Sequence, residues 1–166
     1  GNNENIIIDK ANKVVIAGCK NSTIPYGIQR IGTYAFDGCS DLQAIELPTS
    51  VTYIEEGAFK GCESLTKMII PESVTYIESY AFAQCYKLTE IKIPDGIRSV
   101  ADYTFDFCTH LVSVTLPESV TCIGWDAFAY CYSLKNIKLP SKVDYIGNWA
   151  FMECQALESI YIPDPV

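Results

Sequence analysis

The chain has 166 residues, 49% of them hydrophobic and 19% charged, a composition typical of one soluble domain with a well-buried core. Its 12 basic and 20 acidic side chains give a formal net charge of −8. This charge argues against binding to nucleic acid or anionic lipid and permits a basic partner. The sequence shows no signal peptide and no run of 18 apolar residues. We therefore expect no membrane insertion, and we expect any export signal or anchor to lie outside this sequence.

The first 24 residues are predicted to form a cap. Two apolar runs, Ile6 to Ile8 and Val14 to Ile16, can pair as a β-hairpin across a turn at Asp9 to Asn12. Such a hairpin would cover the first coil, as terminal units do in repeat proteins. We therefore divide the chain into an N-terminal capping hairpin with an entry coil, residues 1–24, and one continuous solenoid domain of six 23-residue repeats, residues 25–166.

From residue 25 onward the sequence repeats every 23 residues. The stretch SVTYIEEGAFKGCESLTKMIIPE at 50–72 is followed directly by SVTYIESYAFAQCYKLTEIKIPD at 73–95. A period of 23 falls within the range of leucine-rich repeats and outside the ranges of helical-pair and propeller repeats. Six full copies without insertion are marked by three columns: prolines at Pro25, Pro48, Pro71, Pro94, Pro117, Pro140 and Pro163; phenylalanines at Phe36, Phe59, Phe82, Phe105, Phe128 and Phe151; and leucines at Leu42, Leu65, Leu88, Leu111, Leu134 and Leu157.

Two segments of each copy are predicted to be extended. In LTKMIIP, residues Leu65, Met68 and Ile70 match the template L-x-x-L-x-L, which indicates a short parallel strand ended by proline. In VTYI, the branched residues Val51 and Ile54 are expected to point inward. One copy cannot bury its apolar face alone, so the copies are expected to stack with Phe on Phe and Leu on Leu.

The third segment is predicted to be helical. In GAFKGCESL, residues Ala58, Phe59, Cys62 and Leu65 fall at i, i+1, i+4 and i+7, which indicates one face of a short helical turn on the convex side. The predicted fold class is therefore an α/β leucine-rich-repeat solenoid, right-handed, with a parallel β-sheet on the concave face, short helical turns on the convex face and an N-terminal β-hairpin cap.

Most of the eight cysteines follow the repeat. We expect them to be reduced packing thiols, because one row of parallel Cβ vectors suits packing better than disulfide bonds. Cys19 is expected to belong to the core of the entry coil that precedes Pro25. Cys122 shares a column with Tyr53, Tyr76 and Tyr145, where a reactive or pairing role is the alternative. The regular column contains Cys39, Cys62, Cys85, Cys108, Cys131 and Cys154.

No residue pattern indicates an enzyme, and we expect neither catalytic residues, nor a cofactor, nor a metal site. The only histidine, His110, falls in a variable column of the convex turn, so a Ser-His-Asp site has no base. Zinc sites use clustered Cys pairs or His, whereas the chain has no C-x-x-C pair and His110 is its only histidine. The adjacent carboxylates Glu55 and Glu56 fit a solvated edge better than a glycosidase pair.

The repeat P-x-x-V-x-x-I-x-x-x-A-F-x-x-C-x-x-L-x-x-I-x-I/L-P resembles the BspA-like leucine-rich repeats over residues 18 to 163. The opening IAGCKNSTIP resembles the first repeat common in that family, and the fourth copy departs from the pattern at Ala101 and Thr104. The resemblance implies an extracellular or cell-surface protein of a bacterium or a mucosal protozoan. It also implies adhesion to host proteins or other cells, and it brings no catalytic motif.

The outward-facing strand residues, which differ between copies, are the first candidates for a binding site, because repeat scaffolds bind through such residues. The lysines make this strip locally basic, and Ile69 and Tyr161 are candidate apolar anchors. A second candidate is an aromatic patch on the convex turns, since aromatic residues favour interfaces and also fill gaps between turns. The concave strip contains Lys67, Ile69, Glu90, Lys92, Lys135, Lys138 and Tyr161, and the convex patch contains Tyr86, Tyr103, Trp125, Tyr132 and Trp149.

These features predict a non-enzymatic cell-surface or secreted module, expected to be a monomer, that binds a host extracellular or cell-surface protein and mediates adhesion. Two alternatives remain open. The repeats can be a structural spacer in a larger surface protein, in which case the outward residues vary because nothing contacts them. The exposed aromatic residues can instead belong to a carbohydrate-binding module.

Overall fold

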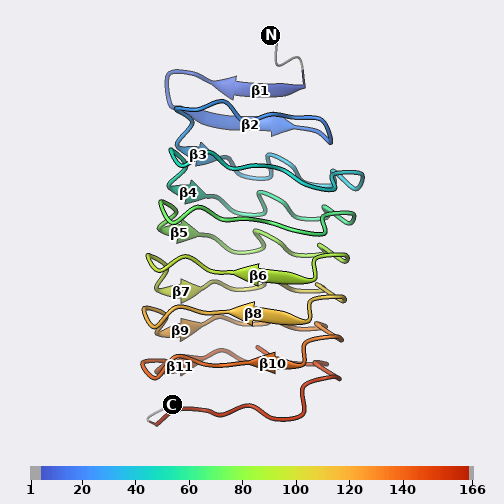
Figure 1. Cartoon of the computed structure of the whole chain (residues 1–166), viewed down its shortest axis with the longest axis vertical. Helices are drawn as coiled ribbons and strands as arrows, with labels where there is room; N and C mark the ends of the chain where they lie inside the picture. Colours follow the sequence, from blue (N-terminus) through green and yellow to red (C-terminus); the bar gives the residue numbers. More distant parts are fainter. Residues whose placement is uncertain (1–4, 165–166) are drawn as a thin grey trace.

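Each copy of the repeat forms one coil that begins at its proline, and the coils stack in sequence order along one axis (Figure 1). The computed structural model describes residues 5–164. We number the coils 1 to 6 from Pro25, Pro48, Pro71, Pro94, Pro117 and Pro140. Each coil contains a post-proline strand segment, a turn segment and a pre-proline strand segment.

An antiparallel hairpin lies at one end of the stack (Figure 1). It consists of β1 (Ile6–Asp9) and β2 (Val14–Gly18). The Asp9 carboxylate accepts hydrogen bonds from the N–H groups of Ala11 and Asn12, both at 3.0 Å, and so closes the turn. β2 then pairs in parallel with the first coil, so the predicted hairpin is present and covers coil 1.

The VTYI-type segments form the post-proline row, in which the branched residues point inward. Val51 and Ile54, for example, are fully buried. The strands of this row pair in parallel and form two sheets. One sheet continues the hairpin in the order β1-β2-β3-β4-β5, and the other has the order β7-β9-β11. Its strands are β3 (Arg30–Ile31), β4 (Tyr53–Ile54), β5 (Tyr76–Ile77), β7 (Ser99–Val100), β9 (Cys122–Ile123) and β11 (Tyr145–Ile146).

The segments that match the L-x-x-L-x-L template form the pre-proline row. Full strands occur in coils 3, 4 and 5, as a parallel sheet in the order β10-β8-β6. In the first half of the stack the same segments make isolated parallel bridges between Glu46 and Ile69 and between Lys67 and Glu90. The strands are β6 (Glu90–Lys92), β8 (Ser113–Thr115) and β10 (Asn136–Ile137).

The prediction of helical turns is wrong, because residues 5–164 contain no helix. The backbone at Gly57 and Gly61 is left-handed, with φ of 58° and 68°, and a right-handed helix cannot contain such residues. Every second N–H in the turn, at Gly57, Phe59 and Gly61, donates to a carbonyl of the next coil at 2.8 to 3.0 Å. The turn segments therefore stack through hydrogen bonds between coils, and the i, i+4 spacing reflects two left-handed residues rather than a helical face.

The core is a set of columns that run the length of the stack. The phenylalanine rings lie 5.2 to 5.6 Å from their neighbours with nearly parallel planes. Phe36 to Phe128 are fully buried, and Phe151 in the last coil is partly buried. The expected stacking of Phe on Phe is therefore confirmed.

One junction in the stack is open along the post-proline row. No strand pairing or backbone hydrogen bond joins β5 to β7, although both strands lie in the part of the chain that the structure describes. The turn segments of the same two coils remain joined, for example by Phe82 N–H to Thr104 O at 3.0 Å. The backbone hydrogen bonds between coils 3 and 4 are therefore confined to the turn and pre-proline segments, while Asp95 N–H donates to the Glu72 carboxylate at 3.1 Å in the post-proline segments.

Candidate functional site

The outward side chains of the pre-proline row follow from strand alternation, which sends successive side chains to opposite faces. In β6, for example, Ile91 is buried, whereas Glu90 and Lys92 are exposed. We call the surface formed by the side chains two and four residues before each proline the pre-proline face. It contains every residue of the predicted concave strip except Lys135, which lies five residues before Pro140.

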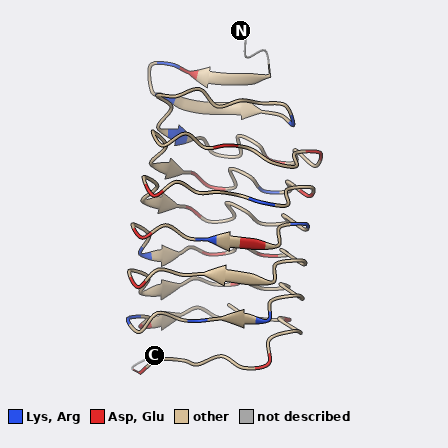
Figure 2. Ribbon diagram, in the orientation of Figure 1, with Lys and Arg blue, Asp and Glu red and all other residues tan. Residues whose placement is uncertain are grey.

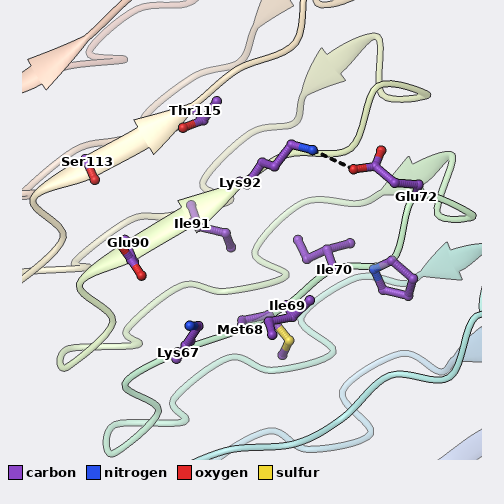
Figure 3. Close-up of a pocket in the computed structure, with 11 residues that line it drawn as sticks. Lys67, Met68, Ile69, Ile70, Glu72, Glu90, Ile91, Lys92, Ser113 and Thr115 are labelled. Carbon is purple, nitrogen blue, oxygen red and sulfur yellow. Dashed lines mark hydrogen bonds and ion pairs between the residues drawn. The ribbon is translucent and has the colours of Figure 1, made fainter.

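A groove of about 540 Å³ crosses coils 2 to 4 on this face (Figure 3). Four residues of the predicted strip, Lys67, Ile69, Glu90 and Lys92, line it together. Ile69 is 69% exposed although it is aliphatic, so it leaves an apolar surface between charged groups. The structure adds three polar residues to the lining: Glu72, Ser113 and Thr115.

Glu72 pairs with Lys92 and changes the charge of the groove. The Lys92 Nζ lies 2.7 Å from Glu72 Oε1 (Figure 3), and this contact raises the pKa of Lys92 and lowers the pKa of Glu72. The lining residues therefore carry both signs, as the two colours on β6 also show (Figure 2). Glu72 was not predicted from the sequence. It follows Pro71 at the start of coil 3, and it contacts Lys92 because the end of that coil lies beside its start.

A second groove, of about 710 Å³, lies on the same face over the last coils. Lys138 and Tyr161 line it together with Glu118 and Asp164. Tyr161 is 77% exposed. Lys135 is exposed but lines neither groove. The predicted strip is therefore divided, with Ile69 as the apolar group of the first groove and Tyr161 as that of the second.

The predicted convex patch is also divided. Trp125 and Trp149 are exposed at the start of their turn segments, whereas Tyr132 lies at the end of the same turn as Trp125 and contacts the edge of the Tyr130 ring. Tyr103 is half-buried and stacks on Tyr80 with ring centroids 4.6 Å apart. Tyr86, the fifth residue of the patch, is half-buried in coil 3. Of the five residues, only the two tryptophans leave large exposed rings close to one corner of the fold.

The cysteines of the regular column pack between coils. All eight are free, and the column thiols donate to a carbonyl of the preceding coil, as Cys85 Sγ does to Phe59 O at 3.3 Å. Burial raises the pKa of Cys85 to about 12 and that of Cys154 to about 11. Because the thiolate is the nucleophile and the metal ligand, these protonated thiols have neither function at neutral pH. Cys122 is half-buried.

Other chemical groups are not gathered into a site. His110 is exposed, and its Nδ1 lies 2.8 Å from the carbonyl oxygen of Tyr86. Within residues 5–164, no three Cys, His, Asp or Glu side chains are placed to share a metal ion. That part of the chain also lacks any helix that could span a bilayer.

Comparison with solved structures finds bacterial repeat proteins. A leucine-rich cell surface protein of Faecalibacterium prausnitzii is 31% identical with a TM-score of 0.75, and the match covers 93% of this chain and 52% of that one. The T. pallidum leucine-rich repeat protein is 29% identical with a TM-score of 0.82, and the match covers 96% of this chain and 79% of that one. The chain thus spans about half of the F. prausnitzii protein.

A third match, to a leucine-rich repeat protein of Eubacterium ventriosum, supports the fold alone, with 24% identity and a TM-score of 0.85 over 100% of this chain and 48% of that one. No curated protein sequence matches the chain. The family described as the BspA type leucine-rich repeat region matches residues 15–100 and 76–166, with six copies. Together with the stacked 23-residue coils, this match shows that the chain belongs to the BspA-type leucine-rich repeat family.

Proposed function

We propose that this domain is a non-enzymatic binding module of a cell-surface or secreted protein, and that its pre-proline face contacts a protein partner. The partner class is an extracellular or cell-surface protein of a host or of another cell, and the module acts as a monomer. The observation that carries the proposal is the first groove, where an isoleucine is 69% exposed between charged side chains of two coils.

Ile69 supports the proposal because interfaces combine an apolar centre with a polar rim. Around it, Lys67 and Glu90 are exposed charges whose side chains have no ion pair within the described residues. They are therefore free to pair with charges of a partner. The likeness to a protein described as a leucine-rich cell surface protein is consistent with this setting.

The test is binding of the labelled chain to an array of extracellular-matrix proteins, mucins, glycans and bacterial surface polymers at physiological salt. We expect saturable binding to a protein and a roughly five- to thirtyfold higher Kd for Ile69→Ser, since loss of a central apolar contact costs about 1 to 2 kcal/mol. Tyr26→Ser is the matched control, because Tyr26 is 83% exposed outside both grooves.

Two results would contradict the proposal. Absence of binding across the array favours a structural spacer, in which the outward residues contact nothing. Binding that free sugar competes away favours a carbohydrate-binding module. An equal Kd for Ile69→Ser and Tyr26→Ser would leave protein binding in place but would remove the first groove from the interface.

A further inference from the structure

Three exposed aromatic side chains lie where the post-proline row meets the turn segments, at β9 and β11. Trp125 follows β9, and Tyr145 and Trp149 belong to β11 and the turn segment after it. They are 46%, 46% and 62% exposed, in that order. We call these three residues the aromatic corner. It shares no residue with the pre-proline face, so binding at the corner is independent of the function proposed for that face.

Two of the three rings are fixed by hydrogen bonds. The Trp125 N–H donates to Asp102 Oδ1 at 2.8 Å, and its indole Nε1–H donates to the Tyr145 hydroxyl oxygen at 2.7 Å. The indole also lies against Gly147, where an added Cβ would come within 2.4 Å of Trp125 Cδ1. The rings are therefore held in place before any ligand binds, which lowers the entropy lost on binding.

Trp149 extends this surface onto the next coil. The Asp126 N–H donates to Asn148 O at 3.1 Å, which sets the residue after Trp125 beside the residue before Trp149. The Trp149 backbone is left-handed, with φ of 59°, and its ring has no hydrogen bond and no ring contact within residues 5–164. The largest exposed apolar surface of the corner is therefore unoccupied by the protein's own side chains.

The corner is acidic. The exposed Asp102 carboxylate accepts the hydrogen bond from Trp125, and the exposed Asp144 directly precedes Tyr145 in sequence. Within the described residues, no lysine or arginine lies over any of the three rings. The corner therefore offers the faces of electron-rich rings next to negative charge.

Coils 1 and 2 show what such a corner binds within the molecule. Tyr53 occupies the same repeat position as Tyr145, four coils earlier. There the Arg30 guanidinium lies 5.2 Å from the centre of the Tyr53 ring and 2.7 Å from the Glu55 carboxylate. Ring, carboxylate and cation thus lie together in the first coils, whereas in the last coils Gly147 replaces Glu55, the carboxylates are those of Asp102 and Asp144, and no cation lies over the rings among the described residues.

We propose that the aromatic corner binds a guanidinium or ammonium side chain of a basic protein segment. Rings attract cations through their negative faces, most strongly in tryptophan, and the attraction grows when a carboxylate lies nearby. The net charge of −8 adds long-range attraction for a basic partner and repulsion for an acidic one. A neutral sugar would stack on the rings and donate hydroxyl hydrogen bonds to the aspartates, but it would gain no long-range attraction from the net charge.

The chain contains only two tryptophans, and both belong to this corner, so their fluorescence reports on it directly. The experiment is titration of the full chain with a hexa-arginine peptide and with hexa-citrulline, which has the same shape without the charge. We expect a saturable change in emission with the arginine peptide and at least a tenfold weaker response to citrulline. An equal response to both peptides would overturn the proposal.

Variants separate this site from general attraction to an acidic protein. Trp149→Ala is expected to raise the Kd for hexa-arginine at least fivefold, with Trp125 still reporting. Asp144→Asn is expected to raise it about threefold, as loss of one exposed charge interaction does. Asp41→Asn, which makes the same change in net charge on coil 1, should leave the Kd within a factor of 1.5, a margin set by about 0.2 kcal/mol.

Thermal melts of the three variants confirm that each is folded before the comparison is made. A Kd unchanged by Trp149→Ala, or raised equally by Asp144→Asn and Asp41→Asn, would overturn the proposal. Displacement of hexa-arginine by a neutral oligosaccharide would also overturn it, because the corner would then be a carbohydrate site.

Discussion

Asp106, in the turn segment of coil 4, is a carboxyl group whose protonation is coupled to folding. Burial and the neighbouring carboxylate of Asp126 raise its pKa from 3.8 to about 6, while Lys60 acts in the opposite direction. The folded state therefore holds this proton more tightly than the unfolded state. Stability contributed by the protonated form is present at low pH and is lost as the pH rises from about 4 through about 6.

We expect Asp106→Asn to stabilise the protein by about 1 kcal/mol at about pH 8, after allowance for solvent screening of this half-buried group. The amide keeps the shape and an acceptor oxygen without the buried charge. At about pH 3 both side chains are neutral, and the two proteins should unfold at the same urea concentration. Urea unfolding at the two pH values measures this, and equal midpoints at about pH 8 would contradict it.

At the residue scale, the repeat predicted which side chains are buried but not every bond they make. The cysteine column faces inward as predicted, with Cys62, Cys85, Cys108 and Cys131 buried and the two end members, Cys39 and Cys154, partly buried. The bonds from Cys62 and Cys85 to phenylalanine carbonyls of the preceding coil were not predictable, since each joins residues 26 apart across two coils. That offset depends on the path of the turn, which periodicity does not determine.

Among the elements, the open junction between β5 and β7 coincides with the loss of one side-chain contact between coils. In the neighbouring coils a glutamate after the strand reaches back one coil: Glu55 accepts from Thr33 N–H at 2.9 Å, and Glu78 accepts from Glu56 N–H at 2.8 Å. Ala101 occupies the same position in coil 4 and cannot do so, although Gly124 and Gly147 also lack the carboxylate at junctions where the strands pair. The tyrosine stack of Tyr53 on Tyr76 also ends here, so this edge of coils 3 and 4 lacks both contacts.

Ala101→Glu is expected to close this edge. The new carboxylate would accept from the Ser79 N–H, which has no hydrogen-bond acceptor within residues 5–164. A charge-assisted hydrogen bond at a partly exposed edge stabilises by about 0.5 to 1.5 kcal/mol. Hydrogen exchange at Ser79 and the urea midpoint measure the effect.

The control for this prediction is Ala101→Gln, whose neutral oxygen should give about half of the gain. A midpoint for Ala101→Glu at or below that of the unchanged protein would show that the missing glutamate does not cause the opening.

The helical prediction failed at the element scale for a physical reason. Residues at i, i+1, i+4 and i+7 line one side of a helix, but they also line one side of a turn that contains a left-handed residue every four positions. Gly57 and Gly61 signal such a turn, yet aromatic residues hold the same backbone at Tyr103 and Phe107. In the later coils these positions are not glycine, so the sequence alone does not indicate the turn there.

The candidate site was predictable only in part. Strand alternation placed Lys67, Ile69 and Lys92 outward, and the structure brings them into one groove. The contact between Lys92 and Glu72 depends on where the chain returns to a corner of the coil, and periodicity gives no corner geometry. The pairing of Trp125 with Tyr145 was missed for the same reason.

For the whole molecule, burial of each coil depends on its neighbours. Phe82 is fully buried between Phe59 and Phe105, with ring centroids 5.6 Å away on both sides. Phe151 stacks only on Phe128, at 5.4 Å, and is partly buried. In a stack of this kind, stability is the sum of terms for each coil and for each contact between neighbouring coils.

The same substitution should therefore cost different amounts along the column. We expect Phe82→Ala to destabilise by about 3 to 5 kcal/mol and Phe151→Ala by about 1 to 2 kcal/mol, because the inner site loses two ring contacts and leaves a closed cavity. Urea unfolding followed by circular dichroism measures both, with the exposed Lys87→Ala expected within about 0.5 kcal/mol of the unchanged protein. Equal losses at Phe82 and Phe151 would mean that the fold is stabilised within each coil rather than between coils, and the solenoid interpretation of its stability would then be wrong.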